Sequence, residues 1–295
     1  MIVAKFARDD FAIFILGNNG STSTHTLNIA DSATFTTGTG TTTINATGTV
    51  NLNTGATLRA RHIDHTHGGA FNFTGGNLSV DTFTGNLTNT GGNLRPGGTP
   101  GDSDMVGTTT INGDYTQQAG ATLALGTRSN GTIDKLDVNG TLSLDGALVV
   151  SAEHGFDGSI GDRLDLLDWD TLSGTFASIA LLNLAAKGVS GAGWNTQDLY
   201  TTGELRIELT GDLNTDGFVG IEDLDIILAN WNAVTHAYDY ASGDVSGDGV
   251  IDATDLQQVI DNWGNGTTPG GNVPEPGSLA VIGLGGLAWL RRRRA

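Results

Sequence analysis

GTTTINATGTVNLNTGATL, residues 40–58, reveals the architecture of the chain, because parts of it recur further along the sequence. GTTTIN recurs at 107–112, and TGATL recurs as AGATL at 119–123. A third unit, TGGNL, occurs at 74–78 and again at 90–94. Imperfect repeats of strand-and-turn units indicate a solenoid, in which stacked rungs share one continuous core.

The hydrophobic pattern of the repeated region is that of β-strands. Val50 and Leu52 alternate with polar positions, and glycine and asparagine separate such short apolar segments from residue 21 to about 210. Glycine and asparagine suit tight corners, whereas threonine packs well on a pleated surface. We therefore predict a mainly β fold, a β-solenoid over 21–210. Because the repeat length is irregular, a β-sandwich stays open as the alternative.

The composition limits the possible partners and stabilising devices. The chain has 295 residues, 14 Lys and Arg against 32 Asp and Glu, a formal net charge of −18 and no cysteine. A surface this acidic excludes nucleic acid as a partner, since phosphates require basic groups. The absence of cysteine excludes disulfides and thiolate metal sites, which leaves oxygen ligands to stabilise a small acidic module.

Residues 93–209 contain five segments in a recognisable order. NLRPGGTPG begins at 93, INGDYTQQAGATLAL at 111, LDVNGTLSLDGALVV at 136, GDRLDLLDWDTLSGTFASI at 161 and LYTTGELRIEL at 199. Together they resemble the end of a bacterial autotransporter passenger. The resemblance implies the last rungs and the cap of a right-handed parallel β-helix. It implies a scaffold and says nothing about an activity.

Two loops further on carry oxygen side chains at calcium-binding spacing. Positions 1, 3, 5 and 12 of such a loop supply side-chain oxygens, position 6 is glycine, position 7 offers its backbone carbonyl, and position 9 commonly acts through water. The predicted ligands are Asp212, Asn214, Asp216, Phe218 and Asp223 in the first loop, and Asp244, Ser246, Asp248, Val250, Asp252 and Asp255 in the second. The two loops predict two Ca²⁺ ions.

Each loop leads into an apolar stripe with helical spacing. The stripe is formed by Leu224, Ile227, Leu228 and Trp231, and again 32 residues later by Leu256, Val259, Ile260 and Trp263. The duplicated loop and helix, with no helix before either loop, resembles the type I dockerin family. The resemblance implies a small α-helical domain of paired F-hands over 211–264, which folds around calcium and docks onto a cohesin-like domain.

The predicted recognition positions depart from the dockerin pattern. In that family loop positions 10 and 11 commonly carry hydroxyl residues that recognise a cohesin. Here these positions are Ile221 and Glu222 in the first loop, then Ala253 and Thr254 in the second. The departure does not affect the predicted calcium ligands, but it leaves undecided whether the module recognises a cohesin-like partner.

The C-terminal stretch is organised as a sorting signal. A linker over 265–272 is followed by the motif Pro274, Glu275 and Pro276, an apolar run over 277–290, and the arginines Arg291, Arg292, Arg293 and Arg294. Fourteen helical residues span only about 21 Å, less than the ~30 Å hydrocarbon core, but the basic cluster holds its end on the cytoplasmic side.

Residues 273–295 resemble the PEP-CTERM sorting signal, because a short motif, an apolar run and a basic end follow one another in this order. The resemblance implies cleavage by an exosortase-type processing enzyme after transient anchoring in the inner membrane, and localisation at the cell surface, outer envelope or extracellular space. Residues 1–20 have two interpretations, a truncated signal peptide or a first strand.

The sequence assigns no catalytic residues. The cluster His62, Asp64, His65 and His67 could bind a transition metal, but its structural interpretation is a polar rung corner or a surface loop. We therefore predict an exported structural or adhesin-like surface protein. The alternative is a secreted protein that binds or degrades polysaccharides, as a lyase or glycoside hydrolase, and docks to a larger assembly through its dockerin.

Overall fold

The computed structural model describes residues 14–18, 22–98, 106–129 and 131–267. The predicted sorting signal, its apolar run over 277–290 and most of the predicted linker lie outside these residues. Within the described residues, neither α-helix has the length and apolar character that a membrane span requires.

Most of the described chain is a stack of short parallel strands. Seventeen strands form one sheet, and all the pairings recorded between them are parallel. The strands are β1 (Phe14–Leu16), β2 (His25–Ile29), β3 (Thr34–Thr36), β4 (Thr41–Ile44), β5 (Gly48–Leu52), β6 (Thr57–Asp64), β7 (Ala70–Phe73), β8 (Asn77–Thr84), β9 (Leu87–Asn89), β10 (Asn93–Leu94), β11 (Thr108–Asn112), β12 (Tyr115–Gln117), β13 (Thr122–Arg128), β14 (Lys135–Leu144), β15 (Ala147–His154), β17 (Leu167–Gly174) and β18 (Ser178–Ala180).

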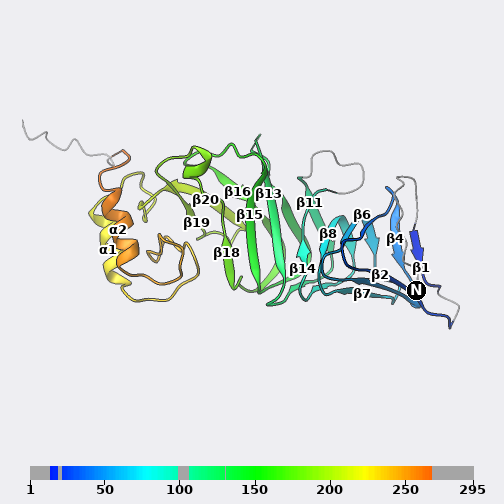
Figure 1. Ribbon diagram of the computed structural model, residues 1–295. Coiled ribbons are helices and arrows are strands. Elements are labelled where there is room, and N and C mark those ends of the chain that lie inside the picture. Colours follow the sequence, from blue (N-terminus) through cyan, green and yellow to red (C-terminus); the bar gives the residue numbers. More distant parts are fainter. Residues whose placement is uncertain (1–13, 19–21, 99–105, 130, 268–295) are drawn as a thin grey trace, which may run out of the picture.

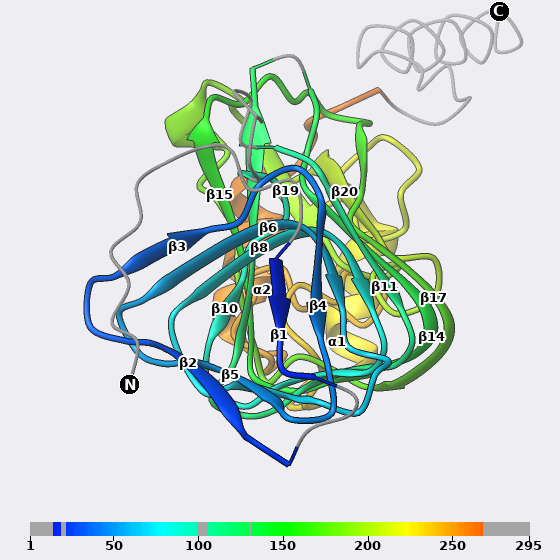
Figure 2. The ribbon, with the colours of Figure 1, turned by 90° about the vertical axis from the view of Figure 1, so that its right-hand side faces the viewer.

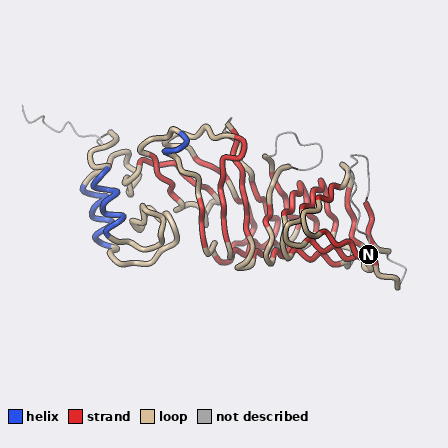
Figure 3. The backbone as a smooth tube through the Cα atoms, viewed as in Figure 1, coloured by secondary structure: helices blue, strands red, loops and turns tan. Residues whose placement is uncertain are grey.

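A small antiparallel sheet and two helices complete the fold. The antiparallel sheet contains β16 (Arg163–Asp165), β19 (Ala192–Asn195) and β20 (Glu204–Leu209), and a 3₁₀ turn, η1 (Ala185–Lys187), precedes β19. The helices are α1 (Ile221–Ala229) and α2 (Ala253–Asp261). We call residues 14–209 the strand body and residues 210–267 the helical module. The helical module lies at the end of the strand body opposite β1 (Figures 1 and 3).

The parallel pairings stack equivalent residues of successive coils. Leu58 pairs with Leu78, Leu78 with Leu94, Leu94 with Leu123, and Leu123 with Leu148. The repeats found in the sequence occupy equivalent places in this stack, since TGATL, AGATL and both copies of TGGNL end on one of these leucines. Viewed from the β1 end, the coils lie one behind another (Figure 2).

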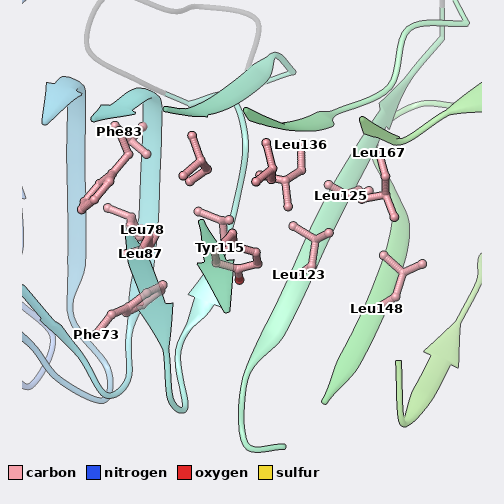
Figure 4. Packing of buried hydrophobic residues seen from close by; sticks show 14 of the residues in the cluster. Phe73, Leu78, Phe83, Leu87, Tyr115, Leu123, Leu125, Leu136, Leu148 and Leu167 are labelled. Carbon is pink, nitrogen blue, oxygen red and sulfur yellow. The ribbon is translucent and has the colours of Figure 1, made fainter. Parts of the chain in front are cut away.

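The interior of the stack is apolar because alternate side chains of each strand point inward. Figure 4 shows Leu78, Leu123 and Leu148 packed among other buried residues. Tyr115 is fully buried among them, and its hydroxyl donates to Gln117 Oε1 (3.2 Å) and accepts from Asn89 Nδ2 (3.4 Å). Outside, Asn51 Nδ2 donates to Asn28 Oδ1 (2.5 Å) and Asn72 Nδ2 donates to Asn51 Oδ1 (2.7 Å), so amides also stack from coil to coil.

The mainly β prediction is confirmed, and the stacked parallel sheet is compatible with a solenoid. The right-handed sense of the coil stays a prediction.

Only some residues of the two apolar stripes predicted for the helical module are buried. Ile227 and Val259 are fully buried, but Leu228 is 56% exposed and Ile260 is 49% exposed. Trp231 and Trp263, 41% and 49% exposed, follow the ends of the helices. Two helices of nine residues cover only one side of each other, so a stripe of this width cannot be wholly enclosed.

Candidate metal centre

Loop 1, residues 212–223, is separated from β20 by two residues and is organised around two buried carboxylates. Asp212 accepts hydrogen bonds from the backbone N–H groups of Asp216 (Oδ1, 3.0 Å) and Gly217 (Oδ2, 2.8 Å). Asp223 accepts from Leu213 (Oδ1, 2.7 Å) and Gly220 (Oδ2, 2.7 Å). Gly217 has a φ of 86°, the left-handed conformation expected of position 6.

Loop 2, residues 244–255, repeats this arrangement. Asp244 accepts from the N–H groups of Gly247 (Oδ1, 2.8 Å) and Gly249 (Oδ2, 3.0 Å). Asp255 accepts from Ser246 (Oδ1, 2.8 Å) and from the residue that precedes α2, Asp252 (Oδ2, 2.9 Å). The hydrogen bonds from positions 6 and 9 thus recur after 32 residues, whereas the other donor to position 1 is at position 5 in loop 1 and at position 4 in loop 2.

Carboxylates converge in loop 2. Oxygen atoms of Asp244, Asp248 and Asp255 lie within 4.8 Å of one another, and within the described chain no other group of three His, Cys, Asp or Glu residues meets this condition. Ligands at 2.3–2.6 Å from one Ca²⁺ lie within about 5 Å of each other, so this triple fits a calcium ion. The three equivalent carboxylates of loop 1 are farther apart, and Asn214 Nδ2 donates to Asp216 Oδ2 there (3.0 Å).

Electrostatics favour a bound cation in both loops. Burial raises the pKa of Asp212 to about 6, although the hydrogen bond from Gly217 N–H lowers this pKa. Burial also raises the pKa of Asp244. Repulsion from a nearby carboxylate raises both pKa values further. Asp223 acts on Asp212 in this way, and Asp255 acts on Asp244. A cation would relieve this repulsion and stabilise the ionised side chains.

The remaining predicted ligands have additional backbone roles. Asp252 caps α2, where its Oδ1 accepts from Thr254 N–H (2.7 Å). Val250 forms an antiparallel bridge with Val234, and Phe218 forms the equivalent bridge with Gly266. Coordination by the Asp252 side chain and by the carbonyls of Phe218 and Val250 stays a prediction.

Each loop is closed by the segment that follows the helix of the other loop. Val219 N–H donates to Asn265 O (3.0 Å), and Gly264 N–H donates to Val219 O (2.9 Å). In the same way Ile251 N–H donates to Ala233 O (3.0 Å), and Asn232 N–H donates to Ile251 O (2.8 Å). The two halves of the helical module are therefore joined reciprocally, and residues 265–267, which the sequence assigns to the linker, take part in loop 1.

The histidine cluster in the strand body has local contacts. Burial works to raise the pKa of Asp64, but hydrogen bonds from Thr66 hold this pKa below its usual value. His67 Nδ1 lies 3.4 Å from Asp64 Oδ2, and His65 Nε2 lies 2.9 Å from the carbonyl oxygen of Gly69. His62 lies on β6 beside Thr41 and Thr82. No three of these four side chains, all described, have ligand atoms close enough to share one metal ion.

Comparison with known families identifies two segments. Residues 210–263 match the model of the dockerin type I domain, and residues 272–294 match the model of the PEP-CTERM protein-sorting motif. No curated protein and no solved structure matches the chain, so the likeness of residues 93–209 to autotransporter passengers stays a prediction. The chain thus joins a dockerin-type, calcium-binding segment to a C-terminal segment of the kind that sorts exported proteins.

Proposed function

We propose that the chain is an exported cell-surface protein in which a β-solenoid carries a dockerin-like module that binds two Ca²⁺ ions. The observation that carries the proposal is the convergence of Asp244, Asp248 and Asp255. The repeated hydrogen bonds of loop 1 support a second ion there. The strand body serves as a stalk or adhesin-like scaffold, a right-handed parallel β-helix, and the helical module serves as its docking unit.

A calorimetric calcium titration of the full chain tests the metal sites. We expect two ions per chain near neutral pH, and one ion for each of the single variants Asp223→Asn and Asp255→Asn. Asp225→Asn removes an exposed acidic group of α1 outside the ligand positions and should leave both ions bound. Failure of the unmodified chain to take up calcium would contradict the proposal.

We propose further that an exosortase-type enzyme cleaves the chain near Pro274, Glu275 and Pro276 while residues 277–290 hold it transiently in the inner membrane. The match of residues 272–294 to the sorting motif supports this step. Mass spectrometry of the protein recovered from the cell surface should find chains that lack Arg291–Arg294. Recovery of surface protein with its arginine tail intact would count against sorting by cleavage.

A second candidate function is binding of an acidic polysaccharide. It is supported by a cavity of about 160 Å³ on the strand body, lined among others by Arg59, Arg95 and Asp134. The Asp134 carboxylate already accepts hydrogen bonds from two backbone N–H groups. Two guanidinium groups at one cavity suit the carboxylates of a uronic acid. Affinity electrophoresis in a polyuronate gel should retard the protein, and Arg59→Ala should reduce the retardation.

Arg61→Ala is the matched control, because it removes the same charge from the same strand outside this cavity. Equal retardation of all three proteins would reject the cavity as a binding site. Release of reducing ends from the same polymers, lost in Asp64→Ala and His65→Ala, would instead favour the enzymatic alternative.

A further inference from the structure

The segment between α1 and loop 2 is attached to the strand body. We call residues 232–243 the connector. The single proton of the Thr196 hydroxyl is shared between the carbonyl oxygens of Ala237 (2.8 Å) and Tyr238 (3.1 Å), and Thr196 N–H also donates to Tyr238 O (3.1 Å). Thr196 is fully buried just after β19, and the rings of Tyr200 and His236 meet edge to face at 5.2 Å.

Tyr238 also contacts the second calcium loop. Its backbone N–H donates to Asp244 Oδ2 (3.0 Å), the carboxylate at position 1 of loop 2. Its ring covers Gly247, where an added Cβ would lie 2.2 Å from Cζ of the tyrosine. Tyr238 has a φ of 61°, a conformation that is uncommon outside glycine, so surrounding contacts must hold its backbone in place.

Loop 1 has no equivalent of this contact among the described residues. The donors to the Asp212 carboxylate are Asp216 and Gly217, both within loop 1. Loop 2 also faces the strand body across a cavity of about 490 Å³, lined by Asp248 and Gly249 on one side and by residues 175–179 on the other. The two loops are similar in sequence but have different surroundings.

We propose that Thr196 and Tyr238 are positioning residues of the second calcium loop. Thr196 holds the backbone of Tyr238, and Tyr238 N–H orients the carboxylate of Asp244 toward the position that the ion takes. Calcium binding in loop 2 and attachment of the connector to the strand body then stabilise each other, because coupling between two sites is reciprocal. The proposal rests on the calcium binding proposed above and adds that the two ions have unequal effects on the strand body.

Hydrogen exchange of the full chain, with and without calcium, tests the coupling. The amide of Thr196 is a direct reporter, because its acceptor is Tyr238 O. We expect calcium to slow its exchange in the unmodified chain and in Asp223→Asn, which keeps loop 2 intact. In Asp255→Asn, which disables loop 2, calcium should leave this exchange unchanged.

A calcium titration of Thr196→Val provides the reciprocal measurement. Loss of the shared hydroxyl hydrogen bond should weaken calcium binding in loop 2 about fivefold, the equivalent of about one net hydrogen bond. Thr201→Val is the matched control, since its exposed hydroxyl bonds within its own turn, to Asp198 O, and it should leave both affinities unchanged.

The possible failures can be separated. A chain that takes up no calcium overturns the proposed function itself. If the chain takes up two ions, two results would overturn this inference alone. In the first, the Thr196 amide exchanges at the same rate with and without calcium. In the second, Asp223→Asn abolishes the slowing of exchange by calcium while Asp255→Asn preserves it. The exchange experiment uses chains that keep Thr196 and Tyr238, so it decides the question even if Thr196→Val fails to fold.

Discussion

Val219 N–H donates a hydrogen bond to the carbonyl oxygen of Asn265 at 3.0 Å, so the segment after α2 closes loop 1. Thr267 N–H adds a second bond, to Gly217 O, at 2.8 Å. Residues that the sequence assigns to a linker therefore belong to the folded module.

A chain that ends after Trp263 should bind calcium more weakly in loop 1 than a chain that ends after Thr267. The shorter chain loses the partners of Gly217 and Val219, and each net hydrogen bond contributes about 1 kcal/mol, or roughly fivefold in affinity. Calorimetry on the two chains measures the difference. Identical affinities for both ions would show that the closing segment does not support the loop.

Calcium binding in loop 1 should weaken as the pH falls below about 6, the pKa to which burial raises Asp212. Below that value calcium must displace a proton, which costs up to about tenfold in affinity per pH unit. Titrations at a series of pH values between neutral and mildly acidic measure this slope.

The stability of the calcium-free protein should have the opposite pH dependence. The pKa of Asp212 is raised above the usual 3.8, so the folded state binds this proton more tightly than the unfolded state does. This group therefore favours folding more as the pH falls from neutral through about 6. Thermal unfolding in a chelator at several pH values tests the sign, and Asp212→Asn should reduce the dependence.

Leu123→Ala should destabilise the strand body by about 2–5 kcal/mol, the usual range for a buried leucine. Leu123 is fully buried and stacks between Leu94 and Leu148. Its strand neighbour Thr122 is partly exposed, so Thr122→Ala should cost less than about 1 kcal/mol. Denaturant unfolding of both variants provides the comparison, and similar losses would show that the packing of this stack does not limit stability.

Ile227→Ala and Leu228→Ala should have very different effects although they are adjacent in the same predicted stripe. Ile227 is fully buried in the core of the helical module, whereas Leu228 is 56% exposed. We expect a loss of about 2–5 kcal/mol for the first and less than about 0.5 kcal/mol for the second. Calorimetric melting of the calcium-loaded proteins measures both, and a large loss for Leu228→Ala would mean that another surface covers it.

The sequence predicts the parallel stack well because each coil repeats the same local pattern. Leu58 and Leu123 end related segments, TGATL and AGATL, and they occupy the same stack. The coil length is less regular, since Leu78 pairs with Leu94 but Leu94 pairs with Leu123, so the register could not be read from the repeats. Burial of the helical stripe also could not be predicted, because it depends on what packs against each side of a helix.

The ligand positions from Asp212 to Asp223 and from Asp244 to Asp255 can be predicted from the sequence, because a calcium-binding loop is a local structure in which residue spacing fixes geometry. Two features become visible only in the folded chain: the segment after each helix closes the other loop, and Tyr238 links Asp244 to Thr196. These are single contacts, many between residues distant in the chain, and several use backbone groups that every residue except proline carries. No residue type or period marks them in the sequence.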